Sequence, residues 1–168
     1  MADMLQGLAA IARPDARLLI LGSMPGEKSL QQQQYYAHPR NAFWPVMASI
    51  LGFEPTLGYP DRLEAMQSRY VALWDVIGYC QRQGSLDSAI KAEQANDFSC
   101  FMRQHSEIHA IAFNGGKAWQ SFRRQVMNKQ SLPAGLQLLQ LPSTSPAHAS
   151  LSFTDKLQHW QKISQLLE

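Results

Sequence analysis

The chain has 168 residues, of which 45% are hydrophobic and 17% are charged, and these values suit one globular domain with a sizeable core rather than two domains. Fifteen Lys and Arg residues against thirteen Asp and Glu residues give a net charge of +2, which is too small to identify a nucleic-acid-binding protein by charge alone. An anionic partner must therefore be held by local hydrogen-bond donors. We expect residues 1–168 to form a single domain.

The sequence also argues against several kinds of site and location. Cys80 and Cys100 are the only cysteines and form no C-x-x-C pair, so neither a zinc site nor an iron–sulfur cluster is predicted. This cysteine usage favours a reducing cytoplasm as the location. No apolar run approaches eighteen residues, and Asp3 precedes the first apolar stretch. We therefore expect neither a membrane span nor a signal peptide.

Four short apolar runs predict strands at residues 17–22, 70–74, 108–113 and 136–141, because each is bounded by turn residues or by a helical pattern. Residues 43–51 follow the first run and carry apolar side chains at helical spacing. Gly52 then stands where a helix commonly ends. Pro45 fits only the first turn of this helix.

Three further helices are predicted by apolar residues at helical spacing: Phe98, Phe101 and Met102; Trp119, Phe122 and Val126; and Leu157 and Trp160. Asn96 is the predicted N-cap of the first, and Ser152, three residues before Asp155, is the predicted N-cap of the last. Strands that alternate with helices favour an α/β fold. We expect a three-layer α/β/α sandwich with a central four-stranded parallel sheet and ligands at the carboxyl ends of its strands.

The loop after the first predicted strand, residues 22–29, has the sequence GSMPGEKS. It fails the spacing of a phosphate-binding P-loop, because three residues separate its glycines and Glu27 stands between Gly26 and Lys28. Two glycines and a proline predict a rigid turn that lets a planar ligand approach the backbone closely. Residues 35–44 (YYAHPRNAFW) then concentrate aromatic and hydrogen-bonding side chains in what we expect to be a functional loop.

Three separated segments resemble the motifs of the uracil-DNA glycosylase superfamily, in particular its hypoxanthine-DNA glycosylase branch, which is related to mismatch-specific uracil glycosylases. They are G-S-M-P-G at 22–26, Y-A-H-P-R-N-A-F-W at 36–44 and L-P-S-T-S-P at 141–146, and the resemblance spans almost the whole chain. It implies a monofunctional enzyme that removes a deaminated base, hypoxanthine and also uracil, from DNA and leaves an abasic site. It also implies no metal or organic cofactor, DNA as the partner and action as a monomer.

The resemblance implies roles for individual residues. Asn41 matches the catalytic asparagine of the branch, whose amide orients a water molecule, and Tyr36 matches an aromatic residue that stacks on the base. The matching base-binding loop is Gly22, Ser23, Met24, Pro25 and Gly26. Met24 stands where mismatch-specific enzymes carry a catalytic asparagine, and Leu141 stands where familiar uracil glycosylases carry a histidine. Both departures predict a more apolar pocket.

Other positions leave two interpretations open. Asp75 ends the second strand, where it could accept the N1–H of hypoxanthine or cap the following turn. Asn114 and Lys117 flank two glycines that either open a phosphate-binding helix or form a plain turn. His38 lies in the matched loop, as a turn former or as a proton shuttle.

The late loop contains Ser143, Thr144, Ser145 and Pro146. Its hydroxyls could hold DNA phosphates, and its tip could fill the space left by an extruded base. The alternative for this loop is a plain connector to the last helix.

Two other functions are compatible with the residues alone. One is a nucleotide-binding α/β protein that uses the first loop for phosphate, and the other is a non-catalytic nucleic-acid binder on the same scaffold. Asn41 distinguishes the glycosylase from a simple binder, because a binder would not need an amide directed at the sugar.

Overall fold

The computed structural model describes residues 3–168. Its central sheet consists of β2 (Leu18–Gly22), β3 (Val71–Asp75), β6 (Ala110–Asn114) and β7 (Gln137–Leu141). The strands are all parallel, in the order β3-β2-β6-β7. They coincide with the four predicted apolar runs to within two residues at each end. β2 and β6 are buried along their whole length, as expected for inner strands of a parallel sheet covered on both faces.

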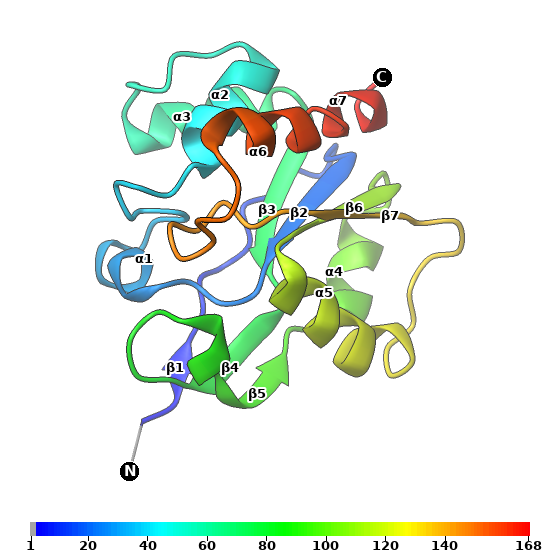
Figure 1. The fold of residues 1–168 in the computed structure, drawn as a ribbon. Helices are drawn as coiled ribbons and strands as arrows, with labels where there is room; N and C mark the ends of the chain where they lie inside the picture. The colour runs from blue at the N-terminus through cyan, green and yellow to red at the C-terminus, as the bar shows by residue number, and fades with distance from the viewer. Residues whose placement is uncertain (1–2) are drawn as a thin grey trace.

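Helices cover both faces of this sheet (Figure 1). One face packs against α2 (Phe43–Leu51), α3 (Tyr59–Gln67), α6 (Phe153–Trp160) and α7 (Ile163–Leu166). The other packs against α4 (Phe98–Gln104) and α5 (Gly116–Phe122), which continues as a π-helical turn over Arg123–Met127. The predicted three-layer architecture is therefore confirmed. Within residues 3–168, no helix has both the length and the apolar character needed to cross a lipid bilayer.

A second, smaller sheet was not predicted. It contains β1 (Leu5–Gln6), β4 (Ile77–Gln81) and β5 (Lys91–Ala95), paired antiparallel in the order β1-β4-β5. Its strands are short and β5 is largely polar, so no apolar run marked them. The short 3₁₀ helix Asp87–Ala89 lies in the connection between β4 and β5. α1 (Glu27–Gln32) was not predicted, and it begins within residues 22–29, which were expected to be a loop (Figure 1).

Two helix N-termini test the predicted caps. Ser152 caps α6 as predicted, because its hydroxyl accepts a hydrogen bond from the amide of Asp155 at 3.1 Å. The prediction for α4 was wrong by one residue: Asp97 is the cap, and its carboxylate accepts from the amide of Cys100 at 3.0 Å. Asn96 instead donates from its side chain to the backbone oxygen of Asp75 at 2.8 Å. The residue that follows β5 thus holds the end of β3.

Candidate active site

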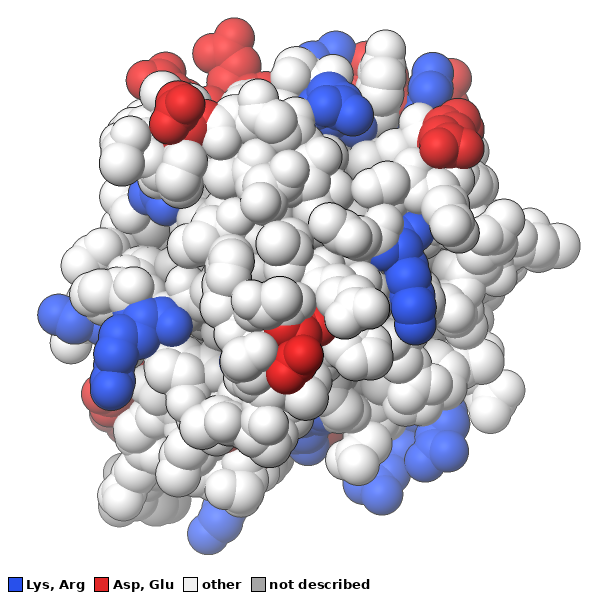
Figure 2. All heavy atoms as spheres, turned by 45° about the horizontal axis from the view of Figure 1, so that its top comes forward, with Lys and Arg blue, Asp and Glu red and all other residues white. Residues whose placement is uncertain are grey.

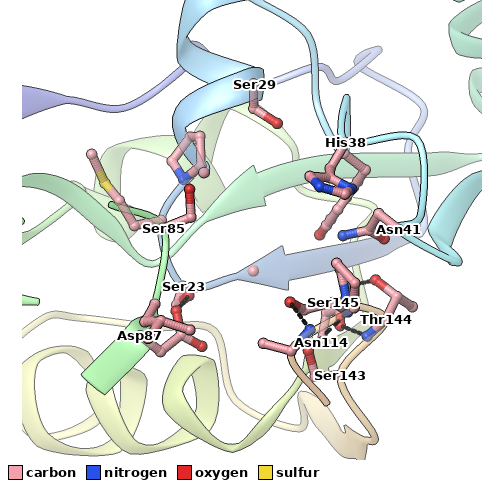
Figure 3. A pocket seen from close by; sticks show the side chains of 18 of the residues that line it. Ser23, Ser29, His38, Asn41, Ser85, Asp87, Asn114, Ser143, Thr144 and Ser145 are labelled. Atoms are coloured by element: carbon pink, nitrogen blue, oxygen red, sulfur yellow. Dashed lines mark hydrogen bonds between the residues drawn. The ribbon is translucent and has the colours of Figure 1, made fainter. Parts of the chain in front are cut away.

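A pocket of about 710 Å³ lies at the carboxyl ends of the central strands. Its walls come from residues 22–29, 85–88 and 143–148 and from Tyr35, Tyr36, His38 and Asn41. In the parallel register Gly22 lies opposite Asp75, so the ends of β2 and β3 meet at the same level. Figure 3 shows His38 and Asn41 together on one side of the pocket, with Ser23 and Asp87 on the other. The volume is within the usual range for small-ligand pockets.

The structure brings together thirteen of the fourteen predicted site residues. The lining contains Asn41, Gly22, Ser23, Met24, Pro25, Gly26, Tyr36, Asp75, Asn114, Ser143, Thr144, Ser145 and Pro146. Lys117 is the exception, because its ammonium group pairs with the carboxylate of Glu93 at 2.6 Å. Ser121 and Gln125 also donate to Glu93. Lys117 therefore belongs to a charge cluster beside β5 and does not reach the pocket.

Asn41 is fixed by the start of α2. Its side-chain oxygen accepts a hydrogen bond from the amide of Phe43 at 2.9 Å, and the amide of Ala42 donates to the backbone oxygen of Thr144 at 3.0 Å. The first contact sets the orientation of the carboxamide, and the second joins this loop to the late loop. The NH₂ group of Asn41 and the second lone pair of its oxygen are left for a ligand.

His38 shapes the turn that presents Asn41. Its Nδ1 accepts a hydrogen bond from the amide of Arg40 at 3.1 Å, and its backbone oxygen accepts from the amide of Asn41 at 2.9 Å. Of the two predicted interpretations, the structure supports the turn former. Because Nδ1 acts as an acceptor, the neutral ring carries its proton on Nε2.

Asn114 and Thr144 hold one another across thirty residues of sequence. Asn114 Nδ2 donates to Thr144 Oγ1 at 2.9 Å, and the amide of Thr144 donates to Asn114 Oδ1 at 2.9 Å. Both side chains are buried, and Figure 3 shows the pair at the edge of the pocket. The polar groups of these two side chains position the late loop through their mutual hydrogen bonds.

Hydrogen bonds also fix the other residues of the late loop. The amide of Ser145 donates to the hydroxyl of Ser143 at 3.1 Å, and Lys156 Nζ donates to the backbone oxygen of Ser145 at 3.3 Å. The indole of Trp160 donates to the backbone oxygen of Pro142 at 2.9 Å. The hydroxyl of Ser143 accepts the hydrogen bond from the amide of Ser145, so its own proton is left to donate to an anion.

Gly22 creates room at the floor of the pocket. A Cβ added there would lie 2.5 Å from Asp75 Oδ1 and 3.1 Å from the Tyr36 hydroxyl, distances that would force the neighbouring groups to move. We predicted that this glycine lets a ligand approach the backbone. Gly22 lines the pocket, and the space on the side where a Cβ would project is taken by the carboxyl group and the hydroxyl of the chain itself.

Tyr36 lies with its ring on Phe43. The ring centroids are 3.9 Å apart at an interplanar angle of 25°, so a base could stack only on the opposite face of Tyr36. The residue has a φ of 55°, a left-handed conformation that costs energy in a residue other than glycine. With this backbone conformation, the ring of Tyr36 forms part of the pocket wall.

Asp75 is buried without a partner for one of its oxygens. The residue is only 4% exposed and its Oδ2 has no hydrogen-bond partner. The amides of Val76 and Ile77 donate to the backbone oxygens of Gly22 and Ser23, so Asp75 does not cap the following turn. Burial, reinforced by nearby Asp87, raises the pKa of Asp75 to about 7.

Residues 85–88 form a wall that the sequence analysis did not assign to the site. Ser23 donates from its hydroxyl to Asp87 at 2.6 Å, and the amide of Glu27 donates to the hydroxyl of Ser85 at 2.9 Å. These contacts tie the connection between β4 and β5 to the first loop. The sequence of this segment, SLDS, is mostly typical of turns, and no apolar run predicted the small sheet that positions it.

Met24 and Leu141, the two residues that depart from related motifs, lie in different parts of the structure. Met24 is buried, lines the pocket and packs with Ile77 and Cys80. Leu141 packs in the core between the sheet and α2, and it is not among the lining residues. The predicted apolar contribution to the pocket therefore comes from Met24, and the contribution expected from Leu141 was wrong.

Charge is dispersed over the surface that Figure 2 shows. Lys, Arg, Asp and Glu side chains are scattered there, with wide uncharged areas between them. This distribution agrees with the small net charge of +2. On this face an anionic partner would be bound by hydrogen-bond donors more than by a basic surface.

Substitution of Asn114 by Ala should destabilise the protein strongly. It leaves the amide and the hydroxyl of Thr144 buried without partners, and each unsatisfied group costs about 1–3 kcal/mol. We expect the midpoint of thermal unfolding to fall by roughly 5–10 °C, as measured by circular dichroism. Asn128→Ala, at an exposed position, is the matched control and should change it little. Equal midpoints for the two variants would contradict the role given to the pair.

Substitution of Asp75 by Asn should stabilise the protein in a pH-dependent way. The folded state raises the pKa of Asp75 from 3.8 to about 7, so it binds more protons than the unfolded state in this window and loses stability as the pH rises through it. The variant removes this loss, which is at most about 4 kcal/mol. Its unfolding midpoint should exceed that of the wild type at pH 8, and the difference should shrink towards pH 4.5. A difference independent of pH would refute the burial of a titrating carboxyl.

Comparisons with known proteins agree with the motifs. The family description "Uracil DNA glycosylase superfamily" matches residues 10–168. A hypoxanthine DNA glycosylase from Methanosarcina barkeri is 38% identical over 67% of this chain and 72% of its own length. A hypoxanthine DNA glycosylase from Methanosarcina acetivorans is 31% identical over 94% of this chain and 96% of its own.

The fold is also similar to that of a solved structure. A Methanosarcina acetivorans protein whose structure was solved in solution by NMR superposes with a TM-score of 0.83 at 30% identity. The superposition covers 98% of this chain and 99% of that one. The family resemblance predicted from three motifs is therefore confirmed over nearly the whole chain, and the chain belongs to the uracil-DNA glycosylase superfamily of DNA glycosylases.

Proposed function

We propose that this DNA glycosylase excises hypoxanthine, and also uracil, from DNA as a monofunctional enzyme that leaves an abasic site. The observation that carries the proposal is the placement of Asn41: its carboxamide is fixed at the start of α2, in the wall of a pocket whose floor is Asp75. The two relatives named as hypoxanthine DNA glycosylases support the choice of base.

The pocket requires an extruded nucleotide. A base stacked in a duplex cannot reach a recessed site, so the target nucleotide rotates out of the helix and enters the pocket. The deaminated base then lies over Gly22, between Tyr36 and the first loop. We place the sugar beside Asn41, because this side chain lies on the wall formed by the start of α2.

The bond between base and sugar then breaks. Its electron pair leaves with the base, and the sugar carries positive charge at C1′ until water attacks. Asn41 is too weakly basic to deprotonate water, but its amide can hold a water molecule through its donor and its second lone pair. The water oxygen bonds to C1′ and releases one proton, and the base takes up one proton, so the products are the free base and the abasic sugar.

The late loop is our proposed contact to the DNA backbone. The hydroxyls of Ser143 and Ser145 serve as acceptors within the loop and have protons left to donate to phosphate oxygens. Pro146 is the proposed tip that occupies the space left by the flipped nucleotide. Because Pro146 is small, we expect the enzyme to depend on the weak pairing of the lesion itself.

Substitution of Asn41 by Ala should abolish most excision while DNA binding is kept. The amide acts on the transition state, so its loss should lower the single-turnover rate about 30-fold to 1,000-fold, or about 2–4 kcal/mol. The measurement uses a hypoxanthine-containing duplex, with affinity for abasic-site DNA determined in parallel.

Asn41→Ser is the matched control for this prediction. Serine keeps an oxygen that can cap α2 but carries no amide, so it should restore the stability lost in Asn41→Ala without restoring the rate. Near-normal single-turnover excision by either variant would refute the assignment of Asn41.

The reaction should form no covalent link between enzyme and DNA. Lys28 is the lysine in the pocket lining, and it is exposed on the first turn of α1, whereas an activated lysine needs desolvation or a cationic neighbour. We expect borohydride to trap no adduct while alkali cleaves the abasic product. A stable protein–DNA adduct that disappears in Lys28→Ala would contradict the monofunctional mechanism.

A further inference from the structure

We propose that Asp75 recognises the flipped base as a neutral carboxylic acid, donating one hydrogen bond to a carbonyl of the base and accepting one from the adjacent ring N–H. This inference rests on the proposed function and specifies how the same pocket selects its substrate. It would make Asp75 the residue that determines specificity, distinct from Asn41, which acts at the sugar.

The geometry places an unpaired carboxyl group at the pocket floor. Asp75 lines the pocket and is 4% exposed, and its Oδ2 is buried with no hydrogen-bond partner. The hydroxyl of Tyr36 faces the same space beside Gly22 and is also without a partner. Two unsatisfied polar groups in one pocket floor indicate a ligand that completes their hydrogen bonds.

Among residues 3–168, no cationic side chain forms an ion pair with Asp75. The two ion pairs within residues 3–168 are Arg13–Asp15 and Lys117–Glu93. Arg82 is the basic group that acts on Asp75, but it forms no ion pair with that carboxyl group: its Nη2 donates to the backbone oxygen of Pro25 at 2.7 Å, and its Nε and Nη1 are buried without a hydrogen-bond partner. An ionised carboxylate at this depth would therefore be stabilised only weakly.

The groups around Asp75 favour its protonated form. Asp87, on the 3₁₀ helix after β4, raises the pKa of Asp75, whereas Arg82 lowers it. Tyr36 and Tyr35, from the loop after α1, have raised pKa values through burial and through the nearby Asp75, so both phenols are neutral. Burial has the largest effect, and it keeps a substantial fraction of Asp75 protonated at neutral pH.

A neutral carboxyl group complements the edge created by deamination. Hypoxanthine presents N1–H beside the carbonyl O6, and uracil presents N3–H beside a carbonyl, so each offers one donor and one acceptor in a row. A carboxylic acid offers one acceptor and one donor at matching spacing. An ionised Asp75 would accept from the N–H but would place a negative oxygen against the carbonyl oxygen, losing one bond and adding repulsion.

This difference predicts how two substitutions behave. The amide of Asn has the same donor and acceptor as the neutral acid but does not titrate, so Asp75→Asn should keep recognition at every pH. Asp75→Ala removes both groups. A purely structural Asp75 would give no such separation between the Asn and Ala variants across the pH range.

The test measures single-turnover excision of hypoxanthine from duplex DNA between pH 5.5 and 8.5 for the wild type, Asp75→Asn and Asp75→Ala. The Asn variant is the matched control, because it shares every other titration of enzyme and substrate. We expect the ratio of wild-type to Asp75→Asn rates to be constant below about pH 6 and to fall up to about tenfold per pH unit above about pH 7. Asp75→Ala should be slower by about tenfold or more at pH 6.

A second substrate tests the contact with the base directly. N1-methylhypoxanthine lacks the N1–H, so the wild type should prefer hypoxanthine over it, and Asp75→Ala should lose most of this preference. All three proteins should bind abasic-site DNA equally, which confirms their folding. A rate ratio that does not vary with pH, or an equal preference in the wild type and Asp75→Ala, would overturn this inference and leave the proposed function intact. If the wild-type protein excised neither hypoxanthine nor uracil, both the proposed function and this inference would be overturned.

Discussion

The buried pair of Asn114 and Thr144 is the interaction on which the arrangement of the site depends. Asn114 ends β6, and both polar groups of its side chain bind Thr144. The backbone oxygen of Thr144 then accepts from the amide of Ala42, beside Asn41. A strand end, the late loop and the start of α2 are thus joined in one chain of hydrogen bonds. The amide of Asn41, which we propose to be catalytic, is positioned before any ligand arrives, and this would lower the reorganisation required in the transition state.

The floor of the pocket follows a different physical rule. Beside Gly22, the carboxyl group of Asp75 and the hydroxyl of Tyr36 share one buried space, where Asp75 Oδ2 and the hydroxyl have no hydrogen-bond partner. This arrangement costs stability in the free protein. Strained and unsatisfied groups tend to persist where function uses them. Thr144 and Asp75 therefore illustrate two kinds of buried polar residue: one satisfied and used for positioning, the other unsatisfied and available to a substrate.

More of the fold than of the candidate site could be predicted from the sequence. Continuous apolar runs such as residues 17–22 mark strands that are buried on both faces, and the Ser152 cap is a local signal, so both were predicted correctly. The small sheet was missed because β5 is polar and short. The pairing of Asn114 with Thr144, and of Lys117 with Glu93, joins residues far apart in sequence, where composition and spacing carry no information. The motifs indicated which loops meet, and only the tertiary structure showed which of their side chains are already used by the protein.

The central claim is that this pocket removes a deaminated base from DNA, and base release by the wild-type protein tests it most directly. The measurement incubates the protein with end-labelled duplexes that differ only in one position, hypoxanthine, uracil, xanthine or adenine, and then cleaves abasic sites with alkali. We expect strand breaks at hypoxanthine, weaker breaks at uracil and none at adenine. Absence of alkali-labile sites in every duplex would contradict it.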